Sequence, residues 1–126
     1  MNKTYLEDPN LTCRDVSKLV PELITILSTF LSTLASAGIT MKVIETFRTQ
    51  DRQNMLLRKG ASKIKHSKHQ DCKAVDLIPI DSRGKLLWDF PIKSWELVGE
   101  LAVKSGLIWG GNWKTFKDRV HFQLGE

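Results

Sequence analysis

The sequence predicts an α+β fold in which about three helices pack on a small antiparallel sheet. Segments with helical periodicity are interleaved with a few short runs rich in β-branched residues, and these runs lack the regular spacing of βαβ units. The 126 residues contain no internal repeat, low-complexity tract or linker, so we expect one domain spanning residues 1–126. Hydrophobic residues make up 41% and charged residues 26% of the chain, a composition that excludes a disordered protein.

The first helix is predicted to begin at Pro21, because the missing N–H of proline would be unpaired in a first turn anyway. Gly38 suits the left-handed conformation that ends a helix. Residues 23–39 carry no charge and could be mistaken for a membrane span. Serine and threonine recur along this stretch at helical spacing, however, and form one polar stripe. We therefore expect a half-buried core helix and no membrane insertion.

The remaining elements are predicted from caps, turns and β-branched runs. A second helix is capped by Thr49, continues through Leu57 and is closed by Gly60. Apolar residues at helical spacing predict a third helix from Ile92 to Ser105. The predicted strands are Ile39–Thr46, Cys72–Ile80 and Val120–Leu124, and the predicted loops are Ala61–Asp71, Asp81–Gly84 and the segment from Gly106 onward that carries two tryptophans.

The formal net charge of +5 and the pI near 9.4 favour an anionic partner, such as nucleic acid, acidic lipid or a cell-wall polymer. A basic patch lies in the middle of the chain, but no aromatic residues are interleaved with it, so we do not expect nucleic-acid binding. The patch consists of Arg58, Lys59, Lys63, Lys65, Lys68 and Lys73.

Two further features bear on the cellular setting. Two cysteines, Cys13 and Cys72, are too few for a disulfide scaffold and favour a reduced intracellular environment. Four acidic residues precede the first helix or lie in its first turn, which makes a poor signal peptide, so we expect no export signal of its own.

His69, Asp76 and His121 are the candidate ligands of a catalytic zinc ion. Such sites usually have three protein ligands and leave a fourth position for water. Asp76 is the informative member, because a carboxylate inside the apolar run Ala74–Ile80 would cost several kcal/mol of desolvation unless it were paired or bound to a metal. A buried salt bridge between Asp76 and either Arg48 or a lysine is the alternative, with His69 merely a loop residue. His66 with His69, and His69 with Cys72, are other possible ligand pairs.

Asp118 lies three residues before His121, where it could exchange a proton with a metal-bound water. A solvated surface aspartate is the alternative. Arg48 directly follows a predicted strand and could grip a substrate carboxylate in bidentate fashion, or form a surface ion pair with Glu45 or Asp51. Trp109 and Trp113 could form a platform for a sugar or peptide. Equally, they could be core anchors at a tight turn, which is the expected role for at least one of them.

Three separated blocks of the sequence resemble a known family. The block Ser67-x-His69-x-x-Cys72-x-Ala74-x-Asp76 resembles the S-x-H-x-x-G-x-A-x-D signature of the D-alanyl-D-alanine carboxypeptidase family of zinc peptidases. Residues 106–124, GLIWGGNWKTFKDRVHFQL, resemble the closing motif of one branch, the phage endolysins that act as L-alanyl-D-glutamate peptidases. Residues 45–53, ETFRTQDRQ, are similar to that branch's R-T-x-x-x-Q region. The blocks occur in the family's order, from about Pro21 to the C-terminus.

The resemblance implies a role for each matching position. His69, Asp76 and His121 match the zinc ligands, and Asp118 matches the catalytic acid/base, where the endolysin branch carries aspartate. Arg48 matches the arginine that contacts the substrate or the developing oxyanion. Ser67 lies next to the metal site, where it would hydrogen-bond the substrate or a metal ligand. Cys72 replaces the motif glycine. If that glycine is needed for a positive φ, the Cβ of Cys72 costs on the order of 1 kcal/mol.

The resemblance also implies a hedgehog and D-alanyl-D-alanine-peptidase type of fold and a function. The expected function is zinc-dependent hydrolysis of the L-alanyl-D-glutamate bond in peptidoglycan. The protein would act as a monomer and would reach the wall from the bacterial cytoplasm after a holin opens the membrane. The rivals are a D-alanyl-D-alanine carboxypeptidase, a non-catalytic wall-binding module and a nucleic-acid binder.

Overall fold

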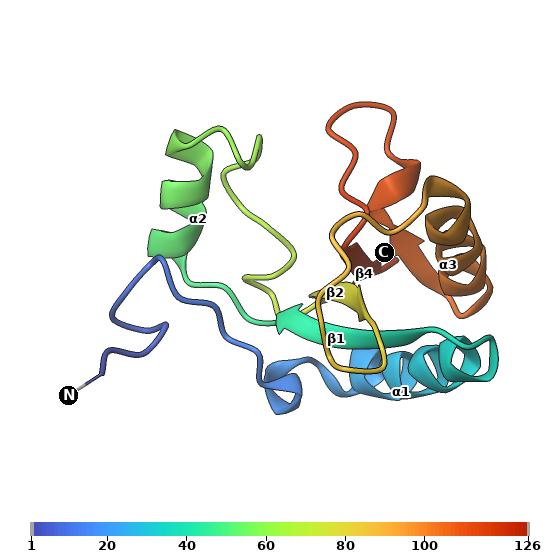
Figure 1. Cartoon of the computed structure of the whole chain (residues 1–126). Coiled ribbons are helices and arrows are strands. Elements are labelled where there is room, and N and C mark those ends of the chain that lie inside the picture. Colours follow the sequence, from blue (N-terminus) through green and yellow to red (C-terminus); the bar gives the residue numbers. More distant parts are fainter. Residues whose placement is uncertain (1, 126) are drawn as a thin grey trace.

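A four-stranded antiparallel sheet organises the computed structural model, which describes residues 2–125 (Figure 1). The strands are β1 (Thr40–Glu45), β2 (Ala74–Ile80), β3 (Leu107–Trp109) and β4 (His121–Leu124), in the order β1-β2-β4-β3. Every neighbouring pair is antiparallel. With the three α-helices, this arrangement confirms the predicted α+β class.

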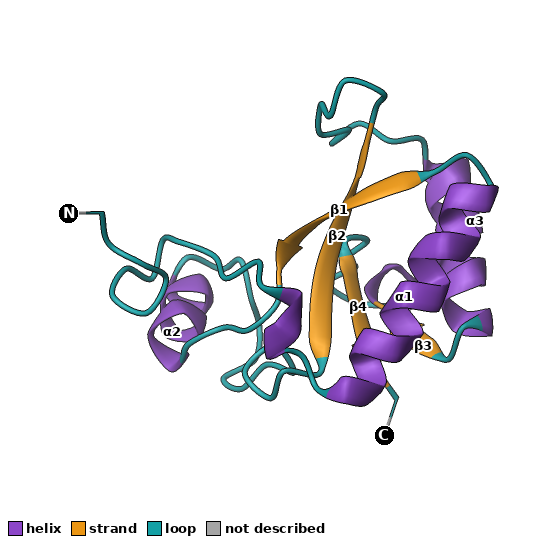
Figure 2. Cartoon of the chain, turned by 90° about the horizontal axis from the view of Figure 1, so that it is seen from below, coloured by secondary structure: helices purple, strands orange, loops and turns teal. Residues whose placement is uncertain are grey.

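Two of the helices, α1 (Pro21–Ser36) and α3 (Ile92–Lys104), lie side by side over one face of the sheet (Figure 2). The third, α2 (Gln50–Arg58), lies apart from them beyond the end of β1 (Figure 1). Two short 3-10 helices, η1 (Val16–Lys18) and η2 (Gly110–Asn112), complete the elements. None of the helices within residues 2–125 has the length and apolar character needed to cross a bilayer.

Helix α1 packs its apolar side onto the sheet, as the serine and threonine stripe predicts. Leu23, Leu27, Phe30 and Leu34 are buried, while the stripe is exposed. The Phe30 ring lies 5.3 Å from that of Phe122 in β4. Burying four such side chains contributes roughly 6–12 kcal/mol before the entropy of ordering them is counted. This side of the sheet is therefore the hydrophobic core.

The predicted helix caps are present. The Thr49 hydroxyl accepts a hydrogen bond from the Arg52 backbone N–H at 3.1 Å, which starts α2. Gly38 and Gly60 have φ values of 81° and 75° just after α1 and α2, where a side chain would be strained.

Strand β3 was not predicted, because the segment after Gly106 was expected to be a loop. It has three residues, too few to show an alternating pattern, and is defined by its pairing with β4: Leu107 lies opposite Leu124 and Trp109 opposite Phe122. Long-range pairing of this kind is absent from local sequence patterns.

The register of the sheet places three polar residues side by side. Asp76 in β2 lies opposite Glu45 in β1 on one side and opposite His121 in β4 on the other. A bulge between Val43 and Glu45 in β1 produces the first of these pairings. Val75 and Leu77 belong to the core, so the alternation of β2 directs Asp76 to the opposite face.

Candidate functional site

Three side chains that are far apart in the sequence meet on the open face of the sheet. Asp76 Oδ1 lies 3.1 Å from His69 Nε2 and 3.3 Å from His121 Nδ1. The side chains are buried, with exposed fractions of 1% for His69, 8% for Asp76 and 5% for His121. Asp76 and His121 come from adjacent strands, and His69 comes from the turn before β2. The geometry therefore brings together the three residues predicted to bind zinc.

Each imidazole is held by a partner at its other nitrogen. His69 Nδ1 lies 2.7 Å from the Thr46 carbonyl oxygen, an acceptor, so Nδ1 carries the proton and donates it. His121 Nε2 lies 2.8 Å from Gln123 Oε1, also an acceptor, so in His121 the proton is on Nε2 and Nδ1 faces Asp76. In the neutral rings, the unprotonated nitrogens then face the Asp76 carboxylate, lone pair against lone pair. Only a cation between them makes this arrangement favourable, and a proton or a metal ion would serve.

The electrostatics of the cluster agree with that need for a cation. Burial by itself would raise the pKa of Asp76, but the His69 and His121 imidazoles, when they are protonated and donate to this carboxylate, outweigh burial and hold the pKa well below its ordinary value. Burial likewise opposes protonation of His121, yet the Asp76 carboxylate raises the pKa of this imidazole. Asp76 thus stays ionised and attracts positive charge into the site.

The donor set fits a zinc ion. One nitrogen or oxygen atom from each of the three residues lies within 4.8 Å of the others, the only such group of His, Cys, Asp and Glu within residues 2–125. Two ligands about 2.05 Å from a tetrahedral zinc ion are about 3.3 Å apart, close to the two separations measured from Asp76. His66 instead pairs with Asp71 at 2.7 Å on the surface, and neither His66 nor Cys72 belongs to the group.

Asp118 lies on the segment between η2 and β4 and lines the cleft that also contains His69, Asp76 and His121. Its backbone N–H donates to the Gly110 carbonyl at 3.0 Å, and its own carbonyl accepts from the His121 N–H at 3.2 Å. Burial, and then the negative charge of Asp76, raise the pKa of the Asp118 carboxyl above its ordinary value. Asp118 is half-buried, which excludes the alternative of a fully solvated surface carboxylate.

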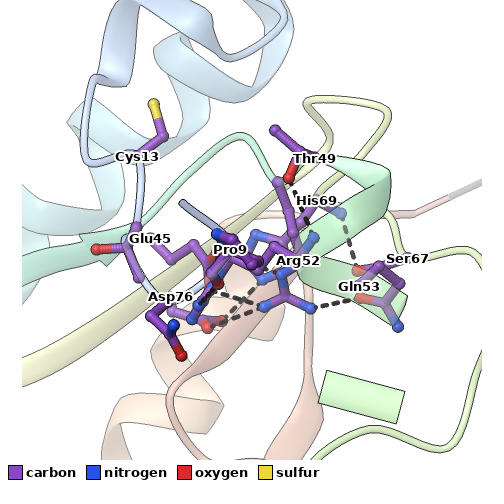
Figure 3. A network of polar contacts seen from close by, with 12 residues as sticks. Pro9, Cys13, Glu45, Thr49, Arg52, Gln53, Ser67, His69 and Asp76 are labelled. Carbon is purple, nitrogen blue, oxygen red and sulfur yellow. Dashed lines mark hydrogen bonds and ion pairs between the residues drawn. The ribbon is translucent and has the colours of Figure 1, made fainter. Parts of the chain in front are cut away.

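Arg48 is part of a buried network rather than a surface ion pair. Its Nε and Nη2 donate to the two Glu45 carboxylate oxygens at 3.2 and 2.8 Å, and its Nη1 donates to Gln53 Oε1 at 2.9 Å. Arg52 pairs with the same carboxylate at 2.6 Å. Figure 3 shows Glu45, Arg52 and Gln53 beside His69 and Asp76. Of the two alternative partners, Glu45 and Asp51, the structure shows Glu45, and the expected surface exposure of the pair is wrong. Arg48 Nη2 lies 3.9 Å from Asp76 Oδ2, a longer contact than those of the imidazoles.

These contacts limit what Arg48 can do. Its Nε–Nη2 edge is already occupied by Glu45, so a bidentate grip on a substrate carboxylate could use only the remaining N–H groups of the two terminal nitrogens.

Ser67 and Cys72 shape the turn that carries His69. The Ser67 hydroxyl accepts a hydrogen bond from the His69 backbone N–H at 3.1 Å and is buried. Cys72 has a φ of 60°, so the position occupied by glycine in the motif does require a left-handed residue here. The cysteine keeps that conformation at the cost of strain.

The site opens into a cleft of about 860 Å³ whose rim is formed by the loops around residues 61–68 and 113–116. Trp113 lines it, with its ring 5.1 Å from that of His121. Trp109 is a core residue instead. It is 5% exposed, and its indole N–H donates to the Arg119 carbonyl at 2.8 Å. Of the two tryptophans, Trp109 is therefore a core anchor and Trp113 lines the cleft.

Three supporting residues were not identified from the sequence. Gln53 is fully buried, and its amide group donates to Ser62 Oγ and the Ile64 carbonyl at 2.9 and 2.7 Å. Gln123 holds His121, and Gly110 allows the Asp118 carbonyl to approach closely. The R-T-x-x-x-Q block contains Gln53 and could have indicated its role. No local sequence pattern indicates the roles of Gln123 and Gly110.

Comparisons with known proteins agree with this geometry. Residues 60–124, just over half of the chain, match the sequence model of the family described as D-alanyl-D-alanine carboxypeptidase. The peptidoglycan L-alanyl-D-glutamate endopeptidase CwlK of Bacillus subtilis strain 168 is 29% identical over a match that covers 71% of this chain and 64% of CwlK. The chain therefore spans less than two thirds of the length of that relative.

Two solved structures are similar. The Serratia marcescens L-Ala D-Glu endopeptidase ChiX superposes with a TM-score of 0.70 and 29% identity, covering 91% of this chain and 89% of ChiX. The vancomycin-resistance D,D-pentapeptidase VanY, solved in complex with Zn(II), superposes with a TM-score of 0.63 and 15% identity, covering 84% of this chain and 72% of VanY. The VanY match supports the fold alone, and confirms the fold type implied by the resemblance. On the evidence of the matched segment, the chain belongs to the D-alanyl-D-alanine carboxypeptidase family.

Proposed function

We propose that the protein is a zinc-dependent peptidoglycan endopeptidase that hydrolyses the bond between L-alanine and D-glutamate in stem peptides. One observation carries the proposal: three buried ligands meet at the base of a cleft, with Asp118 on its wall. The choice of bond is supported by CwlK and ChiX, both described as endopeptidases for this bond and both 29% identical to this chain.

A zinc ion held by His69, Asp76 and His121 would polarise the scissile carbonyl and make a water molecule more acidic. The proton transfers are carried out by a side chain of the protein. The Asp118 carboxylate takes a proton from the attacking water as the C–O bond forms. It returns that proton to the departing D-glutamyl nitrogen as the C–N bond breaks. A raised pKa suits the first half of this exchange, because a carboxylate whose conjugate acid is too strong is a weak base and would not take the proton from the water.

Positioning is supplied by the surrounding contacts. The Thr46 carbonyl and Gln123 fix the rotation of the two imidazoles, and the Ser67 hydroxyl fixes the backbone of His69. The Arg48 guanidinium, held by Glu45 and Gln53, places a positive charge beside the site, where it would help stabilise the oxyanion.

Mass spectrometry of digested peptidoglycan tests the proposal. Purified peptidoglycan is incubated with the zinc-loaded protein, with and without a chelator. The expected product is a new D-glutamate amino terminus that is absent in the chelated sample. Release of free D-alanine would instead identify a D-alanyl-D-alanine carboxypeptidase, the activity for which the family is named. Unchanged fragments in both samples would contradict an enzymatic role.

A matched pair of variants separates catalysis from wall binding. Asp118→Asn should abolish hydrolysis while zinc stays bound. Asp89→Asn makes the same chemical change on an exposed residue outside the cleft and should leave the rate unchanged. If Asp118→Asn digests peptidoglycan like the parent protein, Asp118 is not the acid/base.

We further propose that this activity serves host-cell lysis, with access to the wall depending on a holin. The support is the resemblance of residues 106–124 to the closing motif of phage endolysins. Controlled expression in a bacterial host tests it: culture density should collapse when a holin is co-expressed and stay constant without one. Equal lysis in both cultures would contradict dependence on a holin.

A further inference from the structure

The cleft carries two cations that no carboxylate within residues 2–125 neutralises. Its own acidic groups are largely engaged: Glu45 pairs with Arg48 and Arg52, Asp71 pairs with His66, and Asp76 faces the two imidazoles. Lys63 and Lys114 also line the cleft, and no acidic oxygen within residues 2–125 lies within 4.0 Å of either ammonium group. A bound metal ion would add to the positive balance.

The two lysines come from two different loops that line the cleft. Lys63 belongs to the loop after α2, and Lys114 to the segment after η2. The Lys63 ammonium group lies 5.7 Å from the centre of the Phe116 ring, so the two loops approach each other across the cleft. Phe116 lies only two residues after Lys114. Both lysines line the same cleft as His69, Asp76 and His121.

The proposed substrate has its charge on one side of the cleaved bond. The D-glutamate of a stem peptide is joined to the next residue through its γ-carboxyl group, which leaves the α-carboxylate free. The L-alanine on the other side carries no charge. An arrangement of two cations with no internal partner is complementary to such a free carboxylate.

We propose that Lys63 and Lys114 form a subsite for the α-carboxylate of the D-glutamyl residue, so that the enzyme prefers stems with free D-glutamate over stems with amidated D-isoglutamine. The inference rests on the proposed function and names its substrate class. Both lysines are exposed, so each contact is screened by water and salt. The expected preference is therefore about three- to tenfold in kcat/KM, and it should shrink as salt rises.

Two synthetic stems test the inference. One is L-Ala-γ-D-Glu-L-Lys and the other L-Ala-γ-D-isoGln-L-Lys, both with blocked ends so that only the α-carboxylate differs. Cleavage is followed by chromatography and mass spectrometry with the zinc-loaded protein at low and high salt. The wild-type protein should cleave the acid faster than the amide by the factor given above.

Paired variants show whether the effect is local. The double variant Lys63→Gln/Lys114→Gln should bring the acid-to-amide ratio close to one. The double variant Lys42→Gln/Lys85→Gln removes the same total charge from exposed positions outside the cleft and should keep the wild-type ratio. Equal cleavage of both stems by the wild-type protein, or an equal loss of preference in both double variants, overturns the inference. If neither stem is cleaved, the proposed function itself fails.

Discussion

Replacing Gly110 with alanine should slow catalysis by displacing Asp118. A Cβ atom at position 110 would lie 2.3 Å from the Asp118 carbonyl oxygen, 3.1 Å from His121 Cβ and 3.2 Å from the Trp113 ring. Since Cβ atoms in proteins do not approach other heavy atoms closer than about 3.0 Å, the Asp118 backbone must retreat by at least about 0.7 Å. The same movement strains the hydrogen bond from the Asp118 N–H to the Gly110 carbonyl.

A displacement of about 1 Å at a catalytic group can cost roughly a hundredfold in rate. We therefore expect kcat/KM of Gly110→Ala to fall about 10- to 100-fold. Overpacking should also lower the free energy of unfolding by about 1–3 kcal/mol. The assay is cleavage of a soluble stem peptide at saturating zinc, with the melting temperature and zinc content of each variant measured in parallel.

Gly125→Ala is the matched control, because the nearest atom to its added Cβ, Ile108 Cδ1, is 4.0 Å away. This variant should behave like the parent protein. A folded, zinc-loaded Gly110→Ala that cleaves at the wild-type rate would refute the reasoning that the close backbone approach positions Asp118.

Three other outcomes are expected. Cys72→Gly should raise the free energy of unfolding by up to about 1 kcal/mol in urea titrations, because glycine adopts the left-handed φ of 60° without the steric strain of a Cβ. A destabilised variant would show that contacts of the cysteine side chain compensate for this strain. Gln53→Leu should lower the free energy of unfolding by about 2–4 kcal/mol and lower kcat more than it changes KM. The substitution removes the acceptor of Arg48 Nη1 and leaves Ser62 Oγ and the Ile64 carbonyl without their donor. A variant as stable and active as the parent protein would show that Gln53 does not support the site. Zinc at a thousand times its Kd should raise the free energy of unfolding by about 4 kcal/mol and raise Tm by roughly 10–20 °C in differential scanning fluorimetry. An unchanged Tm would contradict zinc binding to the folded state.

The elements that the sequence predicts best are those with local signals. Pro21 and Gly38 bracket α1, and the Thr49 hydroxyl caps α2, because these signals depend on residues within one or two turns. The three ligands were predicted as a group because a carboxylate in a buried strand needs a partner and because their order matches a family signature. The register that pairs Asp76 with His121 then brings two of them together.

The parts that were missed depend on contacts between distant segments. Strand β3 exists only through its pairing with β4. The burial of Arg48 follows from the packing of α2 and the N-terminal segment around Glu45. Arg52, for example, donates both to Glu45 and to the Pro9 carbonyl. The role of Gly110 depends on Asp118, eight residues away, folding back onto it. No periodicity or cap reports such contacts.

Anomalous scattering at the zinc edge, from a crystal grown with zinc, would locate the ion whose binding underlies the whole account. We predict one strong peak about 2.0–2.2 Å from His69 Nε2, Asp76 Oδ1 and His121 Nδ1, with Asp118 nearby but not coordinating. No peak at this position, or a peak at His66 and Asp71 instead, would contradict a shared metal ion.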